Sequence, residues 1–171
     1  SVRQSRKIDF GYKEQVEMEY PAIIQKVKEV FPECKVVVMG HSLGGQMGSM
    51  FVSRYHSLVD GLILNASCSV YYKGWNWASH GILAFAKFSD FLAKSLGSYP
   101  GNKIGFGGVE AKGIIKYWYH TAKTGNFSAA GSSFNYNDAM KHSKVPVLGI
   151  TYQDDSSAPP AALKNLLGKF V

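Results

Sequence analysis

Apolar residues recur in this chain with two spacings, and its first third shows both. In residues 13–31 they recur every three or four positions with charges between them, which predicts a helix. Pro21 interrupts this pattern, so it either kinks the helix or marks the start of its main part. Residues 34–40, CKVVVMG, form instead a short continuous apolar run, which is typical of a strand buried on both faces of a parallel sheet. A second helix is predicted over residues 43–56.

Two more apolar runs extend this pattern. VDGLILNAS, residues 59–67, and KVPVLGITYQDD, residues 144–155, are both typical of buried strands. Helices and strands therefore alternate in the first and last parts of the chain. This alternation predicts an α/β fold with a mainly parallel sheet and flanking helices.

Residues 68–143 differ from the rest in composition. They hold 15 of the 23 aromatic residues, and helical stretches alternate there with glycine-rich loops such as YPGNKIGFGG. This favours a mostly helical, aromatic-rich lid insertion between two strands. Its aromatic residues either form its own core or roof an apolar substrate pocket. We expect one partial domain over residues 1–171, with a sheet core in 1–67, the insertion in 68–143, and a strand, loop and helix in 144–171.

The candidate chemistry lies where the first predicted strand meets the second predicted helix. Gly40-His41-Ser42-Leu43-Gly44 has the G-x-S-x-G pattern, in which a serine on a tight strand-to-helix turn becomes an exposed nucleophile. We expect Gly40 and Gly44 to be small because the turn would otherwise clash. The backbone N–H of Leu43 would begin the helix and face a developing oxyanion. The alternative is a plain glycine-rich turn without chemistry.

These stretches resemble the α/β-hydrolase superfamily, in particular the bacterial-type predicted hydrolases grouped with its serine aminopeptidase-like branch. GHSLGGQ matches the nucleophile motif, and DGLILNAS matches the strand that precedes the lid. VPVLGITYQDDSSAP is similar to the strand and loop that carry the catalytic acid, and YPGNKIGFG and the later YW are similar to lid features of this subgroup. The resemblance extends from about residue 9 to residue 170.

The resemblance implies a role for four residues. Ser42 is the implied nucleophile, and the amide of Leu43 is one oxyanion donor. Asp155, four residues before Pro159, is the implied acid, with Asp154 as the fallback; such an acid holds a histidine in the required tautomer. The alternative is that both aspartates belong to a loop that caps the following helix.

The histidine that serves as general base in this superfamily has no counterpart at the matching position of this chain. The superfamily's chain order is Ser, acid, His, whereas the five histidines of this chain all precede Asp155: His41, His56, His80, His120 and His142. The residues before the first helix are also too few for the strands that would supply a second oxyanion N–H. We therefore expect a hydrolase fold incomplete at both ends, which is oligomeric or depends on a partner that completes its sheet.

The net charge of +7 is concentrated in one part of the chain. Residues 70–144 hold nine Lys and three acidic residues, which form either a solvated lysine surface or an attraction for an anionic substrate or membrane surface. The lysines are scattered singly, so we expect no nucleic-acid partner. No apolar run approaches the roughly 18 residues of a membrane span, so we expect no integral membrane association.

The remaining residues add little chemistry. Cys34 and Cys68 lack metal-ligand spacing and are interpreted as two buried, reduced thiols of a cytoplasmic protein. No metal and no organic cofactor is implied. The first residues carry basic side chains but no apolar core after them, unlike a secretory signal.

The expected function is that of a serine hydrolase cleaving an ester, thioester or amide of a small-molecule acyl substrate, through an acyl-enzyme at Ser42. The alternative is a non-catalytic hydrolase-like fragment or binding module, which the unmatched histidine supports. A nucleotide-binding protein is disfavoured because GHSLGG lacks both the lysine of a phosphate loop and the G-x-G-x-x-G spacing.

Overall fold

The computed structural model of the chain describes residues 9–170, which fall into two compact units. The sheet unit comprises Glu14–Ser69 and Ser133–Val171, and the helical unit comprises Ser1–Lys13 and Val70–Ser132. The helical unit covers most of the insertion predicted over residues 68–143. The end of that range, residues 133–143, groups with the sheet unit.

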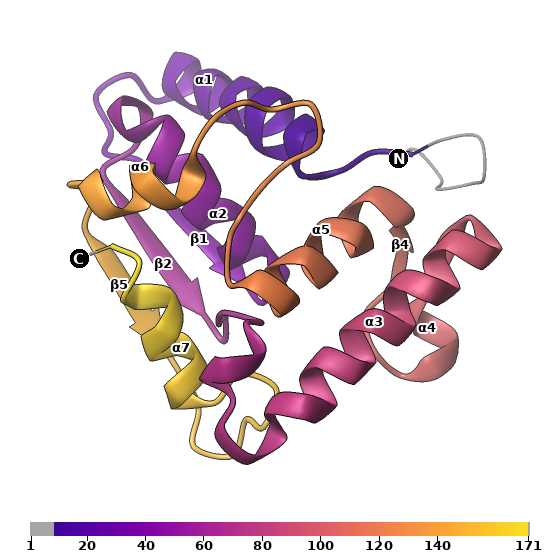
Figure 1. Cartoon of the computed structure of the whole chain (residues 1–171). Coiled ribbons are helices and arrows are strands. Elements are labelled where there is room, and N and C mark those ends of the chain that lie inside the picture. The colour runs from indigo at the N-terminus through magenta and orange to yellow at the C-terminus, as the bar shows by residue number, and fades with distance from the viewer. Residues whose placement is uncertain (1–8, 171) are drawn as a thin grey trace. The chain divides into compact units, whose positions relative to one another are not determined.

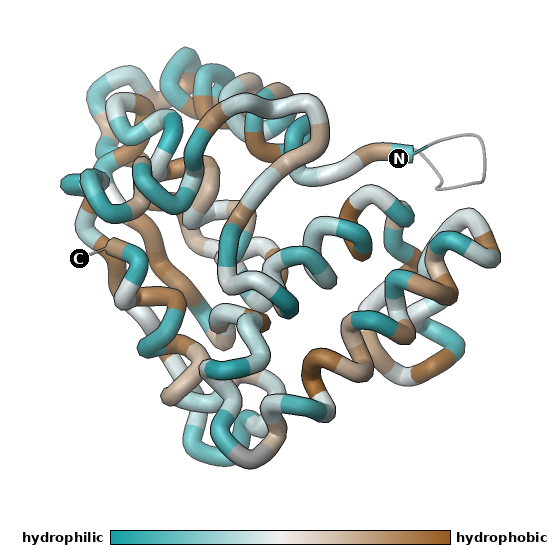
Figure 2. The backbone as a smooth tube through the Cα atoms, in the orientation of Figure 1, coloured by the Kyte–Doolittle hydropathy of each residue, from teal (hydrophilic) through white to brown (hydrophobic). Residues whose placement is uncertain are grey.

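Three parallel strands form the centre of the sheet unit. They are β1 (Val37–His41), β2 (Gly61–Asn65) and β5 (Val147–Ile150), in the order β1-β2-β5. Figure 1 shows the three arrows side by side, and Figure 2 shows that β1 and β2 are largely hydrophobic. The helical unit lies in sequence between β2 and β5. The predicted α/β fold with a parallel sheet and flanking helices is confirmed.

Helices separate the strands of this unit along the chain. The elements are η1, a π-helix over Glu14–Glu19, α1 (Tyr20–Val30), α2 (Leu43–Arg54), the 3₁₀ turn η2 (His56–Leu58), α6 (Tyr136–His142) and α7 (Pro160–Leu167). The helices predicted over residues 13–31 and 43–56 are thus present. Of the two predicted roles of Pro21, the structure supports the second, because Pro21 lies in the first turn of α1, directly after the π-helical segment.

Pro21 explains why that helix changes character. Proline has no N–H to donate to the carbonyl four residues earlier, which here belongs to Glu17. The Glu17 carbonyl instead accepts a hydrogen bond from the Tyr55 hydroxyl at 3.3 Å. The side chain of Tyr55, directly after α2, therefore links α2 to the first helix at this point.

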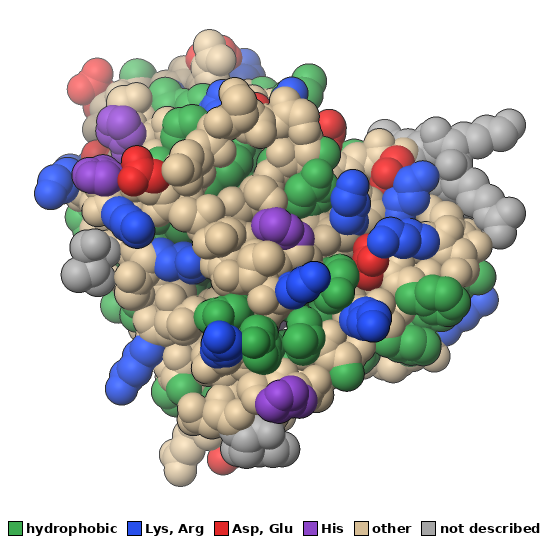
Figure 3. Space-filling view, viewed as in Figure 1, with side chains coloured by type: hydrophobic (Ala, Val, Ile, Leu, Met, Phe, Trp, Pro, Cys, Tyr) green, Lys and Arg blue, Asp and Glu red, His purple; other side chains and the backbone are tan. Residues whose placement is uncertain are grey.

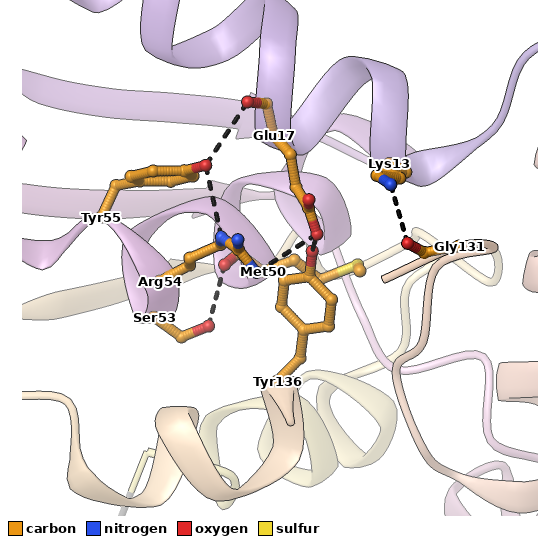
Figure 4. Close-up of polar contacts among 8 residues, drawn as sticks. All are labelled: Lys13, Glu17, Met50, Ser53, Arg54, Tyr55, Gly131 and Tyr136. Atoms are coloured by element: carbon orange, nitrogen blue, oxygen red, sulfur yellow. Dashed lines mark hydrogen bonds and ion pairs between the residues drawn. The ribbon is translucent and has the colours of Figure 1, made fainter. Parts of the chain in front are cut away.

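A polar network around Glu17 joins three helices of the sheet unit (Figure 4). The Glu17 carboxylate accepts a hydrogen bond from the Tyr136 hydroxyl at 2.5 Å and forms an ion pair with Arg54 at 3.3 Å. The Arg54 guanidinium also lies 4.6 Å from the centre of the Phe134 ring. η1, α2 and α6 are therefore linked by a largely buried charge pair as well as by apolar packing.

The helices pack closely on one face of the sheet. A Cβ atom built on Gly48 of α2 would lie 3.1 Å from Leu62 Cδ1, and one built on Gly149 of β5 would lie 2.8 Å from Leu163 of α7. Leu62 pairs with Val147 and Leu64 with Gly149, so these contacts fall on the same face. The small residues let the helices approach the strands.

The opposite face of the sheet is open within the described residues. Val37 and Met39 of β1 are 52% and 60% exposed, and Leu148 of β5 is 56% exposed. The prediction that these runs are buried on both faces is wrong for β1 and β5, because α2 and α7 cover only the other side. An apolar sheet surface is left in contact with solvent.

The helical unit contains more than helices. It is built from the 3₁₀ turns η3 (Tyr72–Gly74) and η4 (Asn76–Ala78), α3 (Ser79–Leu96), α4 (Gly101–Ile104) and α5 (Lys112–Thr124), with an antiparallel pair, β3 (Ser98–Pro100) and β4 (Val109–Ala111). The mainly helical character is as predicted, but the strand pair was not predicted, because strands of three residues give no periodic signal. Tyr99 and Phe127 are fully buried, so part of the aromatic set forms the core of this unit.

The two cysteines occupy different environments. Cys68 is buried, whereas Cys34 is exposed, and both are free thiols. The prediction of two buried thiols is therefore wrong for Cys34, which lies in the turn between α1 and β1. None of the helices in the described part of the chain combines the length and apolar character that a membrane crossing requires.

Candidate active site

Ser42 occupies the turn between β1 and α2 in a conformation that side-chain-bearing residues rarely adopt. Its φ is 51° and its ψ is −120°. Such a backbone costs of order 1–3 kcal/mol and persists only where the surroundings impose it. The side chain is exposed to solvent. The geometry is that of a strained serine turn at the carboxyl end of a parallel strand, as the G-x-S-x-G pattern implies.

Residues after β2 hold this turn in place. The Ser42 N–H donates to the Asn65 carbonyl at 3.2 Å. The Ser42 carbonyl accepts hydrogen bonds from the buried Ser67 hydroxyl at 2.6 Å and from the Gly45 N–H at 3.1 Å. No role was predicted for Ser67. The available signal was a small hydroxyl residue two positions after the end of β2.

The glycines of the motif do not contribute equally. A Cβ atom on Gly40 would overlap the Gly45 nitrogen and lie 2.5 Å from the Gly44 carbonyl carbon, whereas one on Gly44 would meet nothing within 4 Å. A Cβ on Gly45 would overlap the Ser67 hydroxyl and lie 2.5 Å from Ser67 Cβ. The steric requirement predicted for Gly44 therefore falls on Gly45, because the close approach is between α2 and the end of β2.

The Leu43 N–H is placed to bind an anion. Leu43 is the first residue of α2, where backbone N–H groups have no acceptor within the helix. Within residues 9–170 this N–H donates no hydrogen bond. It lies directly beside Ser42 at the positive end of the helix dipole.

The two candidate acids lie on the loop between β5 and α7. Asp155 is half-buried and its Oδ1 accepts hydrogen bonds from the N–H groups of Ser157 at 2.8 Å and Ala158 at 3.1 Å. Asp154 is exposed. Asp155 thus stabilises its own loop, a structural role of the kind that the sequence offered as the alternative to catalysis. Its second carboxylate oxygen takes no part in these bonds.

The loop of Asp155 and the turn of Ser42 meet the same segment of chain. Asn65 accepts the Ser42 N–H through its carbonyl and the Tyr152 hydroxyl, at 2.7 Å, through its side chain. Three residues further, burial and the nearby Asp155 raise the pKa of the Cys68 thiol to about 12. The end of β2 therefore contacts both the serine turn and the aspartate loop, at the carboxyl end of the sheet.

The histidines have no comparable connection to this edge. His41 and His56 are exposed, and exposed His142 hydrogen-bonds the Asp138 carbonyl at 2.9 Å. His80 and His120 belong to the helical unit. In the described residues, no histidine hydrogen-bonds or forms an ion pair with Ser42 or Asp155.

A pocket of about 260 Å³ lies between α1, β1 and α2. It is mostly apolar and is lined by Tyr20, Ile23 and Ile24 of α1, Val38–His41 of β1, and Gly44 and Phe51 of α2. Neither Ser42 nor Leu43 lines it, so we do not assign it to the acyl group. Among residues 9–170, no three His, Cys, Asp or Glu side chains are grouped so that they could hold a metal ion.

Comparison with solved structures shows a likeness of fold to a lipase. The monoacylglycerol lipase of Paleococcus ferrophilus matches 94% of this chain with a TM-score of 0.55 at 15% identity. The meta-cleavage product hydrolase of Pseudomonas fluorescens matches 98% at 13% identity with a TM-score of 0.47. The chain spans 62% of the length of each. At these identities the likeness to the lipase concerns the fold.

A family model matches the amino-acid sequence directly. No curated protein sequence matches the chain. The model of the alpha/beta hydrolase fold matches residues 6–107, which include β1, the serine turn, α2 and β2. Because this match covers more than half of the chain and the parallel sheet carries the motif where that fold requires it, the protein belongs to the alpha/beta hydrolase fold family.

Proposed function

We propose that the protein is a serine hydrolase that cleaves an ester, thioester or amide through an acyl-enzyme at Ser42. The observation that carries the proposal is the backbone of Ser42, whose φ of 51° lies outside the usual region and is held by hydrogen bonds with Asn65 and Ser67 at the end of β2. Strained backbone at an exposed hydroxyl is typical of a nucleophile. A plain glycine-rich turn would have no need of it.

The chemistry follows from the groups beside Ser42. Its Oγ attacks the substrate carbonyl carbon while a general base accepts the hydroxyl proton. The carbonyl oxygen gains the negative charge and accepts a hydrogen bond from the Leu43 N–H. Collapse of the tetrahedral intermediate expels the alcohol, thiol or amine, which takes the proton, and water then hydrolyses the acyl-serine.

Asp155 is the proposed acid, and the base is left unassigned. The free oxygen of Asp155 would orient the base and stabilise its cation, while the other oxygen keeps the loop in shape. Asp154 is less suited because it is exposed. All five histidines precede Asp155 in the sequence, and none of the described contacts selects one of them.

The proposed substrate carries an apolar acyl group. This rests on the aromatic composition of the helical unit, which we propose acts as the lid of the site. The lipase similar in fold acts on monoacylglycerol by its name. A series of p-nitrophenyl esters of increasing acyl length tests the proposal, with the largest kcat/KM expected for the longer chains.

A fluorophosphonate probe tests the nucleophile directly. The purified chain should be labelled covalently, and Ser42→Ala should not be labelled. Ser57→Ala, which changes an exposed serine of η2, should be labelled like the wild type. Mass spectrometry of the labelled peptide should place the adduct on Ser42.

The alternative function predicts another outcome. If a folded wild-type sample stays unlabelled, with folding verified by circular dichroism, this chain is a non-catalytic hydrolase-like module. Labelling that persists in Ser42→Ala would place the nucleophile elsewhere and contradict the proposal.

A further inference from the structure

The helix α3 has an unusual distribution of side chains. Its buried positions hold small or polar residues, namely Ala86, Ser89, Asp90 and Ala93. Amphipathic helices normally turn their large apolar residues toward the core. Here the large rings point the other way, since Phe88 is 51% and Phe91 is 63% exposed.

The buried face of α3 packs against other elements of the helical unit. α3 packs against α5 and β3 of the same unit, and small side chains permit this close approach. Asp90 is only 5% exposed and forms an ion pair with Lys94 at 2.6 Å. Phe88 and Phe91 lie outside this buried face and are exposed.

The exposed apolar surface continues beyond α3. Residues 102–109 are all exposed and include Ile104, Phe106 and Val109. The Phe106 ring lies 4.9 Å from that of Phe85 in α3, measured between centroids, which ties this loop to the helix. Phe88, Phe91, Leu96, Ile104, Phe106 and Val109 are called the α3 apolar surface below.

The unit that carries this surface is rich in lysine. The described part of the helical unit holds eight Lys, no Arg and three acidic residues, a net charge of +5. Two of the acids, Asp90 and Asp9, pair with lysines of the same unit. Lys87 and Lys103 are exposed and form no ion pair within the described residues. Figure 3 shows Lys and Arg side chains beside hydrophobic ones over α3, α4 and α5.

We propose that the α3 apolar surface docks on an anionic lipid bilayer. Aromatic and aliphatic side chains flanked by lysines enter the boundary between headgroups and acyl chains, while the lysines remain near the anionic headgroups. The attraction of a charged surface needs no paired geometry, so lysines serve as well as arginines. Protein interfaces are instead depleted in Lys and enriched in Arg, whereas residues 70–132 of this unit hold seven Lys and no Arg. The proposal does not depend on the activity of Ser42.

Flotation with vesicles of two compositions tests the proposal on the whole chain. The protein should float with vesicles of equimolar phosphatidylcholine and phosphatidylserine, and bind those of phosphatidylcholine alone at least about tenfold more weakly. High salt should weaken binding to the anionic vesicles.

Two double variants separate the apolar and the charged parts of the surface. Phe88→Ser with Phe91→Ser should lower the partition coefficient by about tenfold or more, because two exposed rings no longer enter the bilayer. Lys87→Glu with Lys103→Glu should lower it by about tenfold or more. All four positions are exposed, so circular dichroism should be unchanged.

Matched changes on the sheet unit provide the controls. Val30→Ser with Phe31→Ser removes two exposed apolar residues, and Lys35→Glu with Lys144→Glu reverses two exposed charges. Both should bind like the wild type.

Three outcomes would overturn the proposal. In the first, a folded wild-type chain does not float with anionic vesicles. In the second, the Phe88 and Phe91 variant floats as well as its control. In the third, sedimentation velocity shows that the wild type self-associates through Phe88 and Phe91 without binding vesicles, and the surface is then a protein interface.

Discussion

Ser42 and its neighbours show how one residue's conformation depends on residues far from it. The φ of 51° is held by Asn65 and Ser67, which lie more than twenty residues away in the sequence. The turn also requires that no side chain stand between β1 and the start of α2. Gly40 meets that requirement at the strand side, and Gly45 meets it against Ser67.

The unequal glycines give a prediction for stability. Gly40→Ala should lower the free energy of unfolding by roughly 3 kcal/mol, because its Cβ overlaps backbone atoms that cannot move independently. Gly44→Ala is the matched control and should be neutral or stabilising by about 0.5 kcal/mol, since alanine favours the helix. Urea unfolding measures both. Equal destabilisation by the two changes would contradict the steric argument.

Cys68 gives a prediction for the dependence of stability on pH. Burial first, and Asp155 second, raise the pKa of its thiol to about 12, whereas the unfolded thiol loses its proton near pH 9. The raised pKa means that this stabilisation is complete below about pH 9 and is lost as the pH rises toward 12. The free energy of unfolding should therefore fall by about 1 kcal/mol between about pH 9 and 10, and then approach a slope of about 1.4 kcal/mol per pH unit.

Comparison of single variants isolates this effect. Cys68→Ala should show a flatter pH profile than the wild type, while Cys34→Ala, at an exposed thiol, should keep the wild-type slope. At pH 8, iodoacetamide should label Cys34 and leave Cys68 unmodified until urea is added. Identical slopes in wild type and Cys68→Ala would contradict the assignment.

At the scale of elements, the contact between η1, α2 and α6 depends on charge as well as on apolar burial. The Glu17 side chain is 10% exposed and that of Arg54 28% exposed. Loss of one member of such a pair leaves the other with its charge largely removed from water. The Tyr136 hydroxyl would lose its acceptor as well.

Two glutamates of the first helix should therefore respond differently to substitution. Glu17→Ala should lower the free energy of unfolding by about 3 kcal/mol. Glu29→Ala breaks an exposed pair with Lys26, whose side chains are 73% and 56% exposed, and should cost less than about 1 kcal/mol. Thermal or chemical unfolding measures both. A similar cost for the two would mean that the network contributes little.

At the scale of the whole molecule, the open face of the sheet is the main departure from expectation. Parallel sheets are normally covered on both faces, yet Val37, Met39 and Leu148 are more than half exposed. We propose that this face is covered by a partner, which for the purified chain is a second copy. Exposed apolar surface of this kind is typical of association sites.

Sedimentation velocity should show association of the wild-type chain that increases with concentration. Met39→Glu with Leu148→Glu should remain monomeric, because burying a charge against an apolar face is costly. Met18→Glu with Val30→Glu, at equally exposed positions outside the sheet, should associate like the wild type. A monomeric wild type at high concentration would contradict the proposal.

The sequence by itself determined the alternation of strands and helices in the sheet unit, except for α6, and the place of the serine turn. These strands and helices follow from periodicity, and G-x-S-x-G follows from the local conflict between a side chain and a tight turn. Each depends on neighbours within one element, which is why a linear pattern can reveal it. The family assignment rests on the same local features.

Only the tertiary structure decided which residues meet across elements. It places the close contact at Gly45 instead of Gly44, and it brings the Ser67 hydroxyl to the Ser42 carbonyl. One oxygen of Asp155 accepts hydrogen bonds from its own loop. It also left Cys34 and one sheet face exposed. These outcomes depend on contacts between residues far apart in the chain, and no pattern within a single element specifies such contacts.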